Sequence, residues 1–130
     1  MNTRIRYLYR DAGNYKQFAS VVLGGAITLQ EAETITAGLE SGEYFIPSQV
    51  GLPDLQPNMP SFPDHDADHV WHELDVHSGI SLTADPATAD LDIHAFAAMF
   101  TGRWDITEAM KRLGLPYPTG RRSIPQSGRH

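Results

Sequence analysis

The chain has 130 residues and a net charge of −6, from 10 lysines and arginines against 16 aspartates and glutamates, and it contains no cysteine. A chain of this length typically forms one hydrophobic core. The lack of cysteine excludes disulfides, thiol nucleophiles, cysteine-bound zinc and iron–sulfur clusters. The first residues lack the apolar run of a signal peptide, and no later stretch is long enough to span a membrane. We therefore expect one cytoplasmic domain that does not contact a membrane.

The first two predicted elements form a hairpin. Residues 4–10 alternate between two faces, which is typical of a half-buried strand. The inward face of this strand carries Ile5, Tyr7 and Tyr9. Residues 11–14 (DAGN) favour a turn, because glycine and asparagine tolerate a positive φ. Residues 16–23 (KQFASVVL) then predict the second strand.

A helix and a third strand follow the hairpin. Thr28 and Glu31 have the spacing of a capping box, in which each side chain caps the backbone of the other residue, and they predict the start of a helix. Gly42 favours the end of this helix. Residues 43–46 (EYFI) predict a short strand, which Pro47 terminates.

The middle of the chain combines a proline-rich segment with a further predicted strand. Five of the nine prolines lie between residues 47 and 63. Because proline fixes φ and lacks an N–H group, this segment predicts an ordered loop whose apolar residues pack against the body. Residues 69–77 (HVWHELDVH) alternate again and predict a strand. His72 lies on its apolar face, where a neutral imidazole bonded to a backbone carbonyl is the expected arrangement.

Two helices and a tail complete the chain. Apolar residues at helical spacing predict a helix over residues 90–101. Asp105 and Glu108 predict the capped start of a last helix, which Gly114 ends. Residues 117–130 are polar and basic, and we expect them to form a flexible tail.

Together these elements predict a single α+β domain over residues 1–116. The predicted order is β-β-α-β, loop, β-α-α, with a small antiparallel or mixed sheet and helices mainly on one face. The predicted core comprises apolar residues on the inward faces: Ile5, Tyr7, Tyr9, Leu29, Ile35, Leu39, Phe96, Phe100 and Leu113.

The charged residues are segregated along the chain. Residues 23–102 contain thirteen aspartates and glutamates and no lysine or arginine, so all ten basic residues lie nearer the two ends. In one interpretation, which we favour, the ends fold back beside the acidic middle and partly neutralise it. In the other, an acidic face meets a basic partner. We expect an exposed acidic face over the first helix and residues 64–75.

Three segments resemble a group of small uncharacterised bacterial proteins. They are RYLYRDAGNYK (residues 6–16), FIPSQVGLPDL (45–55) and HVWHEL (69–74). The resemblance implies a bacterial family but no activity, because none is attached to that group.

Residues 63–77 (PDHDADHVWHELDVH) combine histidines with acidic residues. Imidazole and carboxylate ligands suit zinc, manganese, iron or nickel. In a helix, His65, His69 and His72 would share a face, but in a strand residues four apart lie about 13 Å apart and cannot bind one ion. The strand interpretation leaves these candidate ligands: His65, His69, Glu73, Asp75 and His77. No known metal-binding spacing is present, and we favour a solvated acidic turn.

A nucleic-acid interface has weaker support. Arg4, Arg6 and Arg10 could line one strand face beside tyrosines, as in single-strand binding platforms. Residues 106–122 begin like a helix-turn-helix, but Pro116 and Pro118 fall where a recognition helix would start. An acidic body would also repel phosphates, so we expect no nucleic-acid partner.

No catalytic motif stands out. The chain has no G-x-S-x-G nucleophile elbow and no phosphate-binding loop. We therefore expect no catalytic residue and no bound cofactor. The leading hypothesis is a non-catalytic interaction or regulatory module whose acidic central surface binds a basic protein. The alternatives are a divalent-metal protein or metal-dependent enzyme using residues 64–77, and a weak nucleic-acid binder using the last helix and tail. The sequence also leaves a homo-oligomer open.

Overall fold

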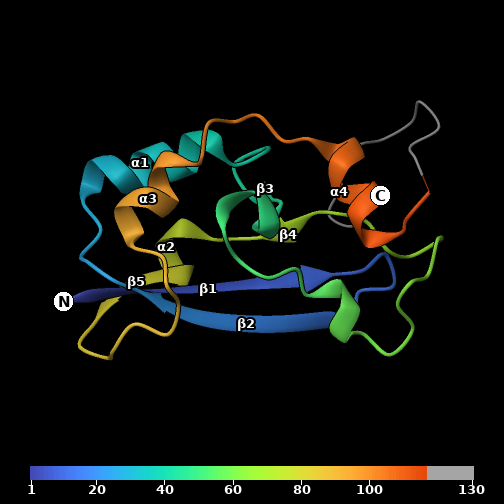
Figure 1. The fold of residues 1–130 in the computed structure, drawn as a ribbon, viewed down its shortest axis with the longest axis horizontal. Helices are drawn as coiled ribbons and strands as arrows, with labels where there is room; N and C mark the ends of the chain where they lie inside the picture. The colour runs from blue at the N-terminus through green and yellow to red at the C-terminus, as the bar shows by residue number, and fades with distance from the viewer. Residues whose placement is uncertain (117–130) are drawn as a thin grey trace.

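The computed structural model describes residues 1–116, which form a five-stranded antiparallel sheet with four helices (Figure 1). The strands are β1 (Asn2–Arg10), β2 (Lys16–Leu23), β3 (Tyr44–Phe45), β4 (His72–Glu73) and β5 (Ile80–Thr83). The helices are α1 (Leu29–Gly38), α2 (Val76–Gly79), α3 (Ile93–Ala98) and α4 (Ile106–Leu113). Two short 3₁₀ helices lie in the proline-rich segment, at Pro47–Val50 and Gln56–Asn58. The predicted α+β class with a small antiparallel sheet is confirmed.

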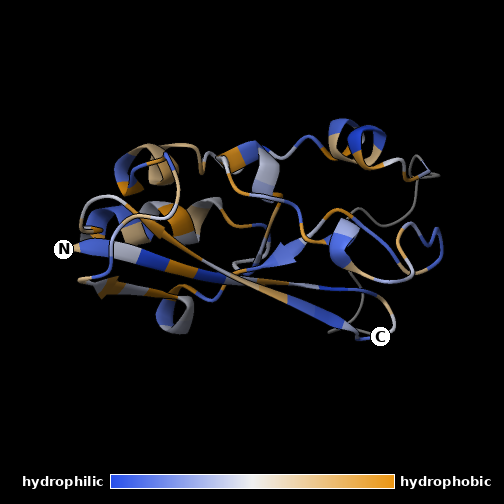
Figure 2. Ribbon diagram, turned by 60° about the horizontal axis from the view of Figure 1, so that its bottom comes forward, coloured by the Kyte–Doolittle hydropathy of each residue, from blue (hydrophilic) through white to orange (hydrophobic). Residues whose placement is uncertain are grey.

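β1 is the central strand, and its two edges have different partners. β2 pairs with it from Thr3 to Arg10. On the other edge, β5 pairs with the first half of β1, and β4 pairs at Leu8. Burial alternates from residue to residue along β1 as predicted, and Figure 2 shows hydrophilic and hydrophobic residues following one another along the long strands. The predicted inward residues are therefore buried: Ile5, Tyr7 and Tyr9.

α1 and α3 pack against each other and lie above the N-terminal half of β1 in Figure 1. The capping box of α1 is confirmed: Thr28 Oγ1 accepts from the Glu31 N–H (3.1 Å), and Glu31 Oε1 accepts from the Thr28 N–H (3.0 Å). Of the core residues predicted in and beside α1, α3 and α4, all but one are buried. The buried ones are Ile35, Leu39, Phe96, Phe100 and Leu113.

Leu29 is that exception, because its side chain is 87% exposed. It precedes Ile35 by six positions, which places it about 120° away around the helix axis. Ile35 faces the sheet, so Leu29 faces solvent. The prediction of a buried Leu29 is therefore wrong.

The proline-rich segment packs into the body as predicted. Four of its apolar side chains are buried: Val50, Leu52, Leu55 and Met59. α4 lies at the other end of the molecule from α1 and α3 (Figure 1) and packs on a second cluster that includes Tyr44 and Trp71. Trp104 joins this cluster to the main core, and its indole N–H donates to the Gly38 carbonyl (3.0 Å).

The predicted strand over residues 69–77 is wrong in length, because only His72 and Glu73 pair. The Asp75 carboxylate accepts from the N–H groups of His77 (3.0 Å) and Ser78 (3.4 Å) and so starts α2. β5 then follows, a strand that the sequence analysis does not predict. α3 is shorter than the predicted helix over 90–101. The predicted tail over 117–130 lies outside the described residues.

Candidate functional site

The polar residues between 64 and 77 lie in three different places. His65 is exposed in the loop before β4, His69 and Glu73 contact β1, and Asp75 and His77 lie at the start of α2. Within residues 1–116, no group of three or more histidine, aspartate or glutamate side chains is arranged to hold a metal ion. The structure therefore does not bring the five predicted ligands together.

The contacts of these residues serve the fold. His69 uses both ring nitrogens: Nδ1 accepts from the Trp71 N–H (3.1 Å), and Nε2 donates to the Arg10 carbonyl (2.8 Å). Glu73 Oε2 forms an ion pair with Arg10 Nε (2.8 Å). The hydrogen bonds that Asp75 accepts, first from the Ser78 side chain and then from the α2 backbone, lower the pKa of its carboxyl. A metal ion would have to displace each of these partners.

His72 is fully buried, as the sequence predicts, and joins two segments. Its Nδ1 donates to the Val70 carbonyl (3.3 Å), and its Nε2 accepts from the Leu55 N–H (3.0 Å). Burial lowers the pKa of His72 to about 3. The ring is therefore neutral near pH 7 and has no nitrogen left to act as a general base.

A second buried polar contact centres on Tyr9. Its hydroxyl donates to Asp68 Oδ1 (2.6 Å) and accepts from the His69 N–H (3.3 Å). Asp68 Oδ2 accepts from the Asp64 N–H (2.8 Å). Burial, and then the bond to Asp68, raise the pKa of Tyr9 above its ordinary value. The hydroxyl keeps its proton and fixes the acidic loop against β1. Sequence reasoning missed this role, because the partners lie about sixty residues apart.

These contacts join the three segments that resemble small bacterial proteins. Tyr7, in the first segment, donates to the Pro53 carbonyl in the second (2.7 Å). Tyr9 stacks at an angle on the His72 ring of the third, with ring centroids 5.2 Å apart. The second and third segments meet at Leu55 and His72. The three segments therefore pack as one unit.

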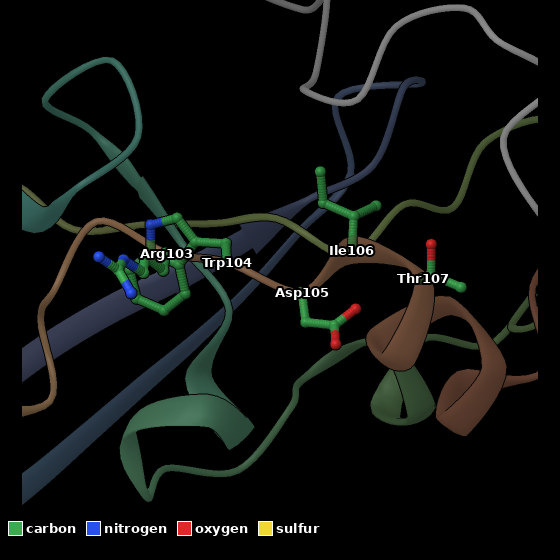
Figure 3. Close-up of a pocket in the computed structure, with 5 residues that line it drawn as sticks. All are labelled: Arg103, Trp104, Asp105, Ile106 and Thr107. Atoms are coloured by element: carbon green, nitrogen blue, oxygen red, sulfur yellow. The ribbon is translucent and has the colours of Figure 1, made fainter.

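A shallow pocket lies at the start of α4, and Figure 3 shows its five lining residues along one continuous stretch, 103–107. Two of its polar groups already have partners. Asp105 caps α4 by accepting from the Glu108 N–H (3.0 Å), and Trp104 donates to Gly38. Arg103 and Thr107 lie at opposite ends of the stretch (Figure 3) and do not converge on a common point. This pocket therefore offers no assembled catalytic group.

Three arginines from the ends of the chain pair with acids of the middle. Arg4 binds Asp85, Arg10 binds Glu73, and Arg112 binds both Asp54 and Glu108. The ends therefore fold back beside the acidic middle, as the favoured interpretation of the charge pattern predicts.

The remaining acids do not form one continuous face. The loop over residues 64–68 packs on the β1–β2 turn, where the Ala12 N–H donates to the Ala67 carbonyl (3.0 Å). α1 lies at the opposite end of the molecule (Figure 1). The prediction of one acidic face that covers both α1 and residues 64–75 is therefore wrong. Around α1, three acids have no ion pair or side-chain hydrogen bond within residues 1–116: Glu33, Glu40 and Glu43.

Comparison with known proteins gives no relative: no protein family, curated protein or solved structure matches the chain. The resemblance to small bacterial proteins stays a prediction. None of the helices within residues 1–116 is long and apolar enough to cross a membrane.

Proposed function

We propose that this protein is a cytoplasmic, non-catalytic interaction module, and that the exposed side of α1 binds a basic partner protein. The observation that carries the proposal is that three acids on α1 and just after it, Glu33, Glu40 and Glu43, form no ion pair with a lysine or arginine of the described chain. We call these three side chains the α1 acidic surface. The lack of cysteine supports a reducing compartment.

The α1 acidic surface also has an apolar contact point. Leu29 and Glu33 are four residues apart and therefore share one side of the helix. Both are exposed, and Leu29 is the most exposed large apolar side chain of the described residues. An apolar side chain beside carboxylates suits a partner that presents an apolar residue beside lysine or arginine.

The chemistry of the buried groups supports a binding role over a catalytic one. The buried imidazole of His72 and the Tyr9 hydroxyl are fully engaged with groups of the protein itself. A general base needs a proton to abstract from a substrate within hydrogen-bond reach. Neither group has a nitrogen or oxygen directed at a cleft.

The test is binding of a fluorescent peptide of alternating lysine and leucine to the 130-residue chain, followed by anisotropy at several salt concentrations. We expect binding that weakens as salt screens the carboxylates, with a Debye length of about 8 Å near 0.15 M. The double variant Glu33→Gln/Glu43→Gln should weaken binding by about threefold to tenfold, the worth of two exposed charge contacts.

The matched control is the double variant Asp66→Asn/Asp90→Asn, which removes the same charge from two exposed positions outside α1. It should bind the peptide like the unmodified chain. Equal losses in both variants would mean that only net charge matters, and the proposal for the α1 acidic surface would fail. Truncation of Leu29 to alanine should weaken binding at every salt concentration, because the apolar contact is not screened.

A further inference from the structure

The open face of the β1–β2 hairpin has a different character from α1. Its cross-strand pairs are Arg6 with Ser20, Leu8 with Phe18, and Arg10 with Lys16. Phe18 is 67% exposed, and Tyr15 in the adjoining turn is 72% exposed. We call these side chains the hairpin face. An apolar pair therefore lies between two pairs that carry positive charge.

Two of these cations have no carboxylate partner within residues 1–116. Arg10 is paired with Glu73, but Arg6 and Lys16 are exposed and form no ion pair there. Lys16 also lies directly opposite Arg10, an arrangement of like charges that destabilises a sheet. Glu73 offsets the charge of Arg10, but no acid of the described residues pairs with Lys16, so an acidic ligand would stabilise this pair.

β2 is also an edge strand with unused backbone groups. The Val22 N–H donates to Thr88 Oγ1 (2.9 Å), and its carbonyl accepts from the Thr88 N–H (2.8 Å), so both groups point away from β1. Backbone direction repeats every two residues along a strand. The N–H and carbonyl groups of Lys16, Phe18 and Ser20 therefore point to the same edge, and within residues 1–116 no hydrogen bond occupies them.

We propose that this edge binds an extended peptide segment of a partner protein as an additional strand, and that the residues of the segment on the hairpin face, every second residue along its chain, include both acidic and apolar side chains. Backbone groups of Lys16, Phe18 and Ser20 would supply the hydrogen bonds, as in β-strand addition. On the hairpin face, an apolar side chain of the peptide packs on Phe18, and an acidic one pairs with Lys16. This surface lies apart from the α1 acidic surface and has the opposite charge, so the two proposals stand or fall separately.

A peptide fits the hairpin face better than a nucleic acid. Arg4 and Arg10 already neutralise Asp85 and Glu73, which leaves Arg6 and Lys16 as its uncommitted cations among the described residues. Proteins that hold nucleic acid at physiological salt make about 6–10 phosphate contacts. Tyr7 and Tyr9, which the sequence suggests as stacking partners, face the core instead. The unused backbone edge also has no role in base stacking.

The test uses a fluorescein-labelled peptide of about ten residues, a length typical of a strand, in which glutamate and valine take turns at every second position and threonine fills the positions between them. The same peptide with glutamine in place of glutamate is the charge control. Anisotropy with the 130-residue chain should show binding of the glutamate peptide only. Phe18→Ala and Lys16→Glu should each weaken binding by about fivefold, as loss of one cross-strand pair predicts. The matched controls Leu82→Ala and Lys111→Glu change an exposed leucine and an exposed lysine outside the hairpin face and should bind normally.

A backbone variant tests strand addition itself. Ser20→Pro removes an N–H group that points to solvent, a position where an edge strand tolerates proline. It should abolish peptide binding while circular dichroism and thermal melting show a folded protein. Should Ser20→Pro not fold, amide hydrogen exchange of the unmodified chain decides instead, with slower exchange of Phe18 and Ser20 expected when peptide is added.

Four outcomes would overturn the proposal. The first is no binding of the glutamate peptide, or binding that Phe18→Ala and Lys16→Glu leave unchanged. The second is equal binding of the glutamine peptide. The third is a dimer in sedimentation velocity that Ser20→Pro dissociates, because a second copy would then occupy the edge. The fourth is binding of a single-stranded oligothymidine that Lys16→Glu and Phe18→Ala abolish, which would assign the hairpin face to nucleic acid.

Discussion

The His72 imidazole forms one hydrogen bond with the backbone of Val70 and one with the backbone of Leu55. Both bonds need a neutral ring, so the stability of the protein is sensitive to acid. A protonated ring would donate from both nitrogens, so the Leu55 N–H would lose its acceptor and the two donors would face each other. Burial adds the cost of placing a charge in the core. Both effects favour the neutral ring in the folded state.

The first prediction concerns pH. Burial lowers the pKa of His72 from its ordinary value of 6.5 to about 3. Between these values the unfolded chain binds a proton that the folded protein excludes. The free energy of unfolding should therefore keep its full value above pH 6.5 and fall below it, by up to about 1.4 kcal/mol per pH unit for this group. His69 adds to the same trend, because burial also lowers its pKa. Urea unfolding between about pH 7 and pH 5 measures the slope.

The variants His72→Gln and His77→Gln distinguish the contribution of His72 to the pH dependence from that of other titrating groups. His72→Gln should unfold more easily at neutral pH, because the glutamine cannot reproduce both bonds, but its stability should fall less steeply with acid. His77 is exposed at the start of α2, so His77→Gln should retain the original slope. The same slope in all three proteins would contradict the role of His72.

The second prediction concerns metal. Because His69, Glu73 and Asp75 each have partners within the protein, excess zinc or manganese should leave the melting temperature of the chain unchanged. A ligand that binds only the folded state would raise it. A rise that His77→Ala abolishes would restore the metal-site hypothesis built on residues 64–77.

At the scale of elements, the sequence predicts those that depend on neighbouring residues better than those that depend on pairing with a distant strand. The hairpin, α1 and α4 follow from alternation, turn residues and helix caps, which act over a few neighbours, and the sequence predicts all three. β4 and β5 depend on β1, about seventy residues away, so their limits cannot be read locally. The candidate metal ligands are separated for the same reason: Asp75 caps a helix and so ends the strand on which the ligand geometry was based.

The third prediction concerns the contact between α1 and the end of α3. A Cβ atom added at Gly38 would lie 2.5 Å from the Phe100 carbonyl oxygen. The Phe100 backbone cannot move aside as a flexible side chain would. Gly38→Ala should therefore lower the free energy of unfolding by about 1–3 kcal/mol. The matched control is Gly24→Ala, since an added Cβ there meets nothing within 4 Å. Urea denaturation of both variants makes the comparison, and equal stabilities would refute the close contact.

At the scale of the whole molecule, two surfaces of opposite charge remain on different elements of one small fold. The arginines that reach the acidic middle each neutralise a carboxylate, and the surfaces left over differ in sign: acidic around α1, basic on the hairpin face. Each surface can orient a partner of the opposite charge before contact. The sequence predicts this separation but not its geometry, because it does not show which acids the arginines reach.

The fourth prediction is that the 130-residue chain does not bind duplex DNA near 0.15 M salt. Its net charge is −6, and Arg4, Arg10 and Arg112 are committed to carboxylates. Phosphate binding needs several free cations and strengthens steeply as salt is removed. Electrophoretic mobility shifts across a salt series provide the measurement. Tight binding with a steep salt dependence would contradict the proposed α1 acidic surface and favour the nucleic-acid alternative.

The position of β1 in the sheet has a consequence for synthesis of the chain. β1 and β2 emerge from the ribosome first, but the strands that complete the second edge of β1 end at residue 83. At about 5–20 residues per second, roughly 3–12 s of translation separate the end of β2 from the end of β5. During this interval the core around Ile5, Tyr7 and Tyr9 is incomplete, and a two-stranded hairpin alone is only marginally stable. A ribosome that stalls before His72 therefore presents an apolar nascent hairpin to chaperones and proteases.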